Sequence, residues 1–205
     1  MGNFLADAVM DGVTAVLQTA DLQVMCEDAP ASYAEATTDK GSGGKALGEI
    51  AVTSGNFSSA NGDVSGRKTS IVEKTPVTVD VTGVFDHAAL VDDGGSVLLA
   101  VSPLAHVPIT AVNQGTKTFT VTGDVSAICV AGKVVSVRGS TGNDGIYVVA
   151  SSSYGAPSTA VVVQEAIPNA TGDGNMIHGA QSVTAGNTCT INAHDVCERT
   201  DPAPW

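Results

Sequence analysis

Valine is by far the most abundant large apolar residue of this chain. The 205 residues include 29 valines against 8 leucines, together with 23 glycines. A β-branched side chain loses rotamer freedom on a helix but packs well on a pleated sheet, and glycine accepts the backbone angles of tight turns. The composition therefore predicts a mainly β chain with many short turns. It excludes a coiled coil, a helical bundle and a collagen-like fibre.

The chain is acidic, with 21 Asp and Glu against nine Lys and Arg and a net charge of −12. Nucleic acids and anionic membranes are bound by clustered basic side chains, and the sequence has no such cluster. We therefore expect neither partner. No apolar run approaches the roughly 20 residues that cross a bilayer, and the first residues lack the basic and apolar regions of a secretory leader. Synthesis in a cytosol is the expectation.

One helix is expected, from Asn3 to about Thr19. Asn3 is a suitable N-cap, and an apolar stripe follows at helical spacing: Leu5, Val9, Val13, Val16 and Leu17. The polar stretch from Glu27 to about Gly66 is expected to be long loops with one or two short strands. Because compact domains rarely leave so long a loop unstructured, we interpret it as an assembly contact that neighbouring molecules order.

Short segments with β-type patterns occupy most of the rest of the chain, and turn residues separate them. The expected strands are 21–26, 46–52, 69–73, 77–81, 87–91, 97–101, 107–112, 117–122, 133–137, 146–150, 159–164, 182–183 and 188–196. Strands at this spacing, without intervening helices, are typical of sandwiches and small barrels.

The charge is unevenly distributed, and this indicates a second domain. Residues 106–179 carry three basic and four acidic residues, net −1, whereas the remainder carries six and seventeen, net −11. We interpret 106–179 as a small β-barrel inserted into a β-sandwich host of residues 1–105 and 180–205 that carries the N-terminal helix. The strand at 188–196 would then return to the host. The alternative is one continuous sandwich with tandem halves.

Cys189, His194 and Cys197 are the best candidates for metal ligands, since zinc binds thiolate and imidazole. On one regular strand, however, the two cysteines would point to one face and the histidine to the other. We therefore expect structural thiols. The four cysteines, which also include Cys26 and Cys129, are too few and scattered for a disulfide scaffold.

Other candidate sites have simpler explanations. Gly41–Ala46 is similar to a phosphate loop but lacks the first glycine and the Ser or Thr after Lys45. Asp92–Asp93 and Asp173–Asn175 offer oxygen ligands for calcium, yet turns also favour such residues. The neighbours Asp86 and His87 do not by themselves make a catalytic triad. We predict no catalytic residue, no metal ligand and no cofactor.

Aromatic residues make up only 4% of the chain, so platforms for stacking on sugars or bases are scarce. The single tryptophan, Trp205, ends a tail with two prolines. We expect this tail to be extended and to dock on a neighbouring molecule.

Several segments resemble a group of virion structural proteins of tailed bacteriophages and prophages, in which the phrases "TYAEA", "GRK", "ATHVALVDD…LL.V" and "LTAGN" recur in this order. The matching segments here are 30–37, 62–68, 84–93 and 184–188, with Asp-His-Ala-Ala where relatives have Thr-His-Val-Ala. Residues 139–149 and 165–168 are similar to a small β module of phage particle proteins. These motifs carry no known catalytic residues.

The resemblance implies a non-enzymatic component of the phage particle, located in the virion. The first choice is a capsid decoration or cementing protein that forms a homo-oligomer and contacts the major capsid protein. The alternative is a tail, collar or fibre-base component. A carbohydrate-binding or cell-surface module is a third hypothesis, weakened by the scarcity of Trp and Tyr.

Overall fold

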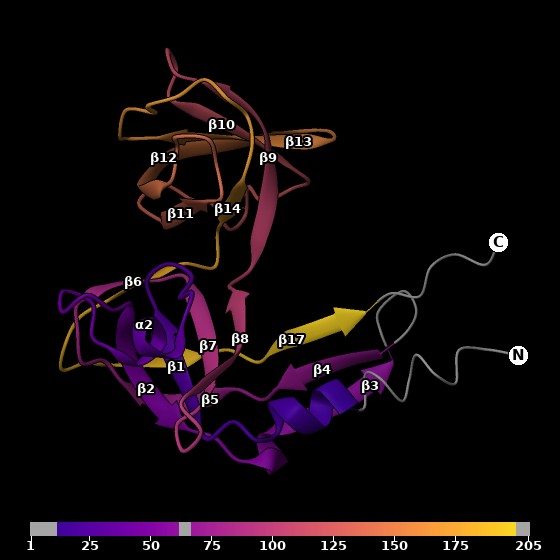
Figure 1. The fold of residues 1–205 in the computed structure, drawn as a ribbon. Coiled ribbons are helices and arrows are strands. Elements are labelled where there is room, and N and C mark those ends of the chain that lie inside the picture. Colours follow the sequence, from indigo (N-terminus) through magenta and orange to yellow (C-terminus); the bar gives the residue numbers. More distant parts are fainter. Residues whose placement is uncertain (1–11, 62–66, 200–205) are drawn as a thin grey trace, which may run out of the picture. The chain divides into compact units, whose positions relative to one another are not determined.

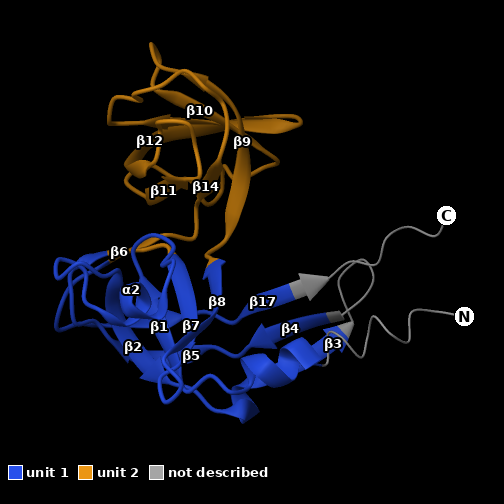
Figure 2. Cartoon of the chain, in the orientation of Figure 1, with its two compact units in different colours: residues 1–83, 87–102, 183–205 blue, residues 84–86, 103–182 orange. Residues whose placement is uncertain are grey.

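The computed structural model describes residues 12–61 and 67–199 (Figure 1). Its elements are mainly strands, which confirms the prediction of a mainly β chain. The chain divides into two compact units (Figure 2). Unit 1 comprises residues 1–83, 87–102 and 183–205, and unit 2 comprises 84–86 and 103–182. The predicted insertion, 106–179, falls within unit 2, which also includes the separate short segment 84–86.

The central sheet of unit 1 has the order β2-β1-β7-β8. Its strands are β1 Leu22–Cys26, β2 Ala46–Ala51, β7 His87–Asp92 and β8 Val97–Pro103. Strand β1 pairs antiparallel with both β2 and β7. Both faces of β1 are covered, because Val24 and Cys26 on one face and Gln23 and Met25 on the other are fully buried.

Two further sheets complete unit 1. One has the order β17-β4-β3, and the other pairs β16 with β5. Their bounds are β3 Phe57–Asn61, β4 Arg67–Ile71, β5 Lys74–Thr78, β16 Thr188–Ile191 and β17 His194–Arg199. The sequence pattern predicted one strand over 188–196, and this is wrong. Exposed Asn192 and Ala193 interrupt it, so that β16 and β17 pair in different sheets.

The expected N-terminal helix is described only in part. Residues 12–17 are helical, whereas Asn3, Leu5 and Val9 lie outside the described residues. The buried side differs from the predicted stripe: Val16 is 56% exposed, and Thr14 is buried instead. The cause is a pair of hydroxyl contacts, because Thr14 Oγ1 lies 2.6 Å from Thr69 Oγ1 and 3.0 Å from Ser59 Oγ. Leu17 of the same helix packs on Phe57 and Ile71.

The polar stretch 27–66 holds more structure than the pattern predicted. Within it lie α2 Tyr33–Thr37, β2, the short 3₁₀ helix η1 Ser54–Asn56 and β3. Helix α2 begins where the Ser32 hydroxyl accepts a hydrogen bond from the Glu35 amide, while Glu35 Oε2 accepts one from the Ala31 amide. Ser-x-x-Glu is a known signal for a helix start, and it stands in the sequence at Ser32–Glu35.

Unit 2 is built around six antiparallel strands that pair in a ring, β10-β13-β12-β11-β14-β9, with β9 returning to β10 as a closed barrel. The strands are β9 His106–Asn113, β10 Thr118–Thr122, β11 Val134–Arg138, β12 Gly145–Gly155, β13 Ser158–Val163 and β14 Asn175–Ile177. A sheet closed on itself leaves few free edges, so a short chain can make a stable core this way.

The core of the barrel is rich in valine, as the composition suggested. Val121, Val135, Val137, Val149 and Val161 are fully buried. Phe119 and Tyr147 provide the aromatic contact at its centre, with ring centroids 5.1 Å apart and planes at 74°. This edge-to-face geometry suits the quadrupoles of the two rings.

Residues 84–86 belong to unit 2 although β7 of unit 1 follows them directly in the chain. They form most of β6 Gly83–Phe85, which pairs with β15 Gln181–Val183. Val84 packs with Ile177 and Ala180 in a small apolar cluster. The Asp86 carbonyl accepts a hydrogen bond from the Leu104 amide. Unit 2 therefore depends on a segment outside its contiguous stretch of sequence.

Candidate functional site

The three candidate zinc ligands lie on two different sheets. Cys189 is on β16, and its Sγ lies 3.0 Å from Met25 Sδ of β1. His194 begins β17, with Nδ1 2.9 Å from the Asn192 carbonyl oxygen. Cys197 packs beside the cluster around Leu17. Among residues 12–61 and 67–199, no three His, Cys, Asp or Glu side chains are grouped as a metal site would require.

The four cysteines form no disulfide with one another, and their burial differs. Cys26 and Cys129 are fully buried, as structural thiols usually are, whereas Cys189 and Cys197 are partly exposed. Burial raises the pKa of the Cys129 thiol, and it does the same for Cys189. A raised pKa lowers the thiolate fraction at neutral pH, so the environment of these two groups does not favour nucleophilic chemistry.

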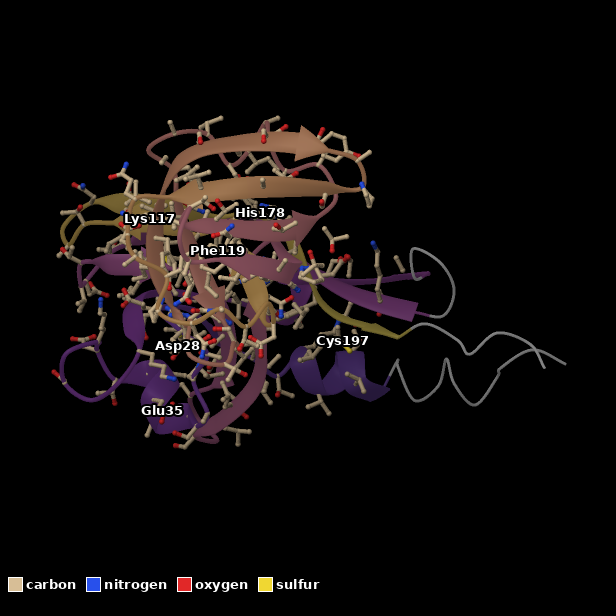
Figure 3. The ribbon with its side chains drawn as sticks, turned by 90° about the horizontal axis from the view of Figure 1, so that it is seen from above. Asp28, Glu35, Lys117, Phe119, His178 and Cys197 are labelled. Carbon is tan, nitrogen blue, oxygen red and sulfur yellow. The ribbon has the colours of Figure 1, made fainter. Side chains whose placement is uncertain are left out.

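The glycine-rich loop at Gly41–Ala46 does not form a phosphate cradle. Lys45 Nζ donates to the Ala29 carbonyl at 2.6 Å and lies 3.3 Å from Asp28 Oδ2 and 3.6 Å from Glu35 Oε2. The two acids are labelled in Figure 3. A lysine that binds phosphate needs its ammonium group directed at the anion, and here two carboxylates surround it.

The carboxylates of the two acidic turns accept hydrogen bonds from other groups of the chain. Asp92 Oδ1 accepts from the Gly95 amide at 2.8 Å, and Asp93 Oδ1 accepts from the Tyr33 hydroxyl. Asp173 accepts from both the amide and the hydroxyl of Thr141, at 2.8 and 2.6 Å. These bonds lower the pKa of Asp173. Asp92 therefore closes its own turn, as the turn explanation predicts, whereas Asp93 and Asp173 bind groups of distant segments.

A buried ion pair occupies one end of the barrel, and the sequence pattern gave no warning of it. Asp86 is fully buried, and its Oδ2 lies 2.7 Å from Arg138 Nη2 and 2.9 Å from Nε. The Ser136 hydroxyl donates to the same oxygen at 2.6 Å. The only available signal was an acid that directly follows apolar Val84 and Phe85. This carboxylate is bound by a guanidinium group and a hydroxyl, an arrangement that stabilises structure rather than performing acid–base chemistry.

The loops at 139–145 and 169–173, which contain the Gly-Ser-Thr-Gly-Asn-Asp-Gly phrase, are joined by a network of side-chain bonds. Asn143 is 1% exposed, donates to the Thr171 carbonyl and accepts from the Asn169 amide. The Tyr147 hydroxyl donates to the Asn143 carbonyl at 2.8 Å. Because each of these polar groups has a partner, the network fixes the two loops against each other.

The barrel also presents exposed large apolar side chains. Ile128, Val130 and Tyr154 are 47%, 54% and 47% exposed, and we call these three the apolar patch. Ile128 and Val130 lie in the turn after β10. The Ser152 hydroxyl of β12 donates to the Ser126 carbonyl of that turn, and Tyr154 follows two residues later on the same face. All three residues of the patch belong to the segment 106–179, which carries almost no net charge.

Comparison of the chain with protein-family models, with curated proteins and with solved structures finds no match. In the described part of the chain, no helix has the length and apolar character that a membrane crossing requires.

Proposed function

We propose that this chain is a non-enzymatic structural component of a tailed-phage particle and, among such roles, a capsid decoration subunit. Three properties support the proposal. The chain is mainly β, its charge is concentrated outside residues 106–179, and the barrel presents the apolar patch. When a second protein covers large apolar side chains on a nearly neutral surface, few charged groups have to be desolvated, so the cost of desolvation is small. Rigid β units keep such a surface in place.

The observation that carries the proposal is that the apolar patch lies in the nearly neutral segment 106–179 and not in the acidic remainder of the sequence. An acidic surface keeps many copies apart before assembly, whereas a neutral surface allows close contact without charge repulsion. We further propose that unit 1 is a β-sandwich host into which the barrel is inserted, and that the barrel makes the contact through the apolar patch. Partners would be the major capsid protein and other copies of this chain.

Mass spectrometry of purified particles, with copy-number determination, tests the proposed role. A decoration subunit is expected at hundreds of copies per particle on the capsid faces. Copies in threes, sixes or twelves on the tail axis would favour the tail, collar or fibre-base role instead. Absence from purified particles, together with glycan binding by the isolated chain, would favour the carbohydrate-binding hypothesis.

Variants of the apolar patch test which surface makes the contact. Ile128→Ser with Val130→Ser is expected to lower incorporation into particles at least about fivefold, since two exposed apolar side chains contribute about 1–3 kcal/mol to a contact that covers them. Val97→Ser is the matched control, because Val97 is 44% exposed but belongs to unit 1. Equal incorporation of both variants would show that the patch is not the contact.

A further inference from the structure

Three basic side chains gather at the end of the barrel from which the chain leaves unit 2. His178 directly follows β14, His106 begins β9, and Lys133 precedes β11. His178, labelled in Figure 3, is only 8% exposed. In the ladder between β14 and β9, its neighbour Ile177 lies opposite His106. The imidazole of His178 makes no hydrogen bond to any residue that the structure describes.

Two hydrogen bonds hold the segment after His178, and basic groups adjoin both. The Gly179 amide donates to the Ala105 carbonyl at 2.9 Å, next to His106. Lys133 Nζ itself donates to the Ala180 carbonyl at 3.0 Å. A Cβ atom on Gly179 would lie 2.8 Å from the Ala105 nitrogen, so the two segments are in close contact.

The surroundings of His178 disfavour its charged form. Burial lowers its pKa, and the positive charges of His106 and Lys133 lower it further. Asp86, whose carbonyl accepts from the Leu104 amide, has its carboxylate paired with Arg138.

We propose that His178 makes the exit segment of the barrel, residues 178–182, sensitive to mild acid. Above its unfolded-state pKa of about 6.5 the imidazole is neutral, and the segment keeps its contacts. As the pH falls from this value towards the lower folded-state pKa, His178 binds a proton in the open form but stays neutral in the closed form. Acidification therefore favours opening, by at most about tenfold for each pH unit of this window.

Amide hydrogen exchange of the full chain at pH 7.5 and pH 5.0, corrected for intrinsic exchange rates, tests this proposal. The protection of Gly179 and Ala180 is expected to fall several-fold at pH 5.0. His178→Gln should remove the change, because glutamine does not titrate. His194→Gln is the matched control in unit 1 and should leave the change intact. Constant protection in the unaltered chain, or the same fall in His178→Gln, would overturn the proposal.

Titration of the histidine ring protons by NMR gives a second measurement on the unaltered chain, needed if His178→Gln does not fold. The midpoint of His178 is expected below the ordinary histidine value of about 6.5 and within the pH range in which Gly179 loses protection. A midpoint at or above that ordinary value would contradict the proposal.

Discussion

At the scale of single residues, the buried carboxylate of Asp86 shows how strongly one charge can affect the stability of the fold. The carboxylate has no exposed surface, and the Arg138 side chain beside it is 17% exposed. Removing one partner of a buried pair leaves the other without compensation, whereas removing both is often nearly neutral. The pair therefore holds Asp86, which directly follows β6, against β11.

Asp86→Ala is expected to lower the free energy of unfolding by about 3–5 kcal/mol, because Arg138 would keep a buried charge without its partner. Asp86→Ala combined with Arg138→Met should recover most of this loss. The measurement is urea unfolding followed by circular dichroism. Lys68→Ala is the control at a partly exposed pair, Lys68–Asp195, where we expect a loss of about 0–1 kcal/mol. A double variant no more stable than the single one would contradict this account.

At the scale of elements, some glycines lie so close to the backbone of a neighbouring strand that no larger side chain fits there. Gly172 lies in the loop before β14, and a Cβ atom there would come within 2.6 Å of Ala111 Cα on β9. Gly155, at the end of β12, has nothing within 4 Å of the same added atom. The two glycines thus separate the effect of crowding from that of losing a glycine.

Gly172→Ala is expected to destabilise unit 2 by more than about 2 kcal/mol, since backbone must move to admit the methyl group. Gly155→Ala should change stability by less than about 0.5 kcal/mol. Thermal unfolding of both variants, monitored by circular dichroism, measures the difference. Equal melting temperatures of the two variants would show that the loop before β14 admits the methyl group without a loss of stability.

Prediction from sequence worked at this scale where the apolar pattern was regular and failed where one local contact decided. The segments of β1 and β10 follow from their alternation and that of β7 from its apolar run, and all three were placed within one residue. Helix α2 was missed because its Ser-x-x-Glu signal stands in a polar stretch. The break at Asn192–Ala193 and the partners of Asp86 depend on pairing between distant segments, which no local pattern carries.

At the scale of the whole molecule, the division into units can be tested by deletion. Replacing residues 103–182 with a Gly/Ser linker is expected to leave a chain that melts cooperatively with a β spectrum. Val84 would lose its partners Ile177 and Ala180, so Val84→Thr should improve the solubility of this deletion. Circular dichroism and sedimentation measure both outcomes. An unfolded or aggregated product with either residue at position 84 would mean that the host requires the barrel.

The position of β16 and β17 has a consequence for biosynthesis. These two strands leave the ribosome after the other described strands, yet they pair with β5 and β4, which were made more than a hundred residues earlier. The barrel strands stand between β5 and β16 in the chain. All of them are therefore synthesised before β16 and β17 can complete unit 1. Contacts so distant along the chain form slowly, and we therefore expect the second unit to be translated and folded before the first is complete.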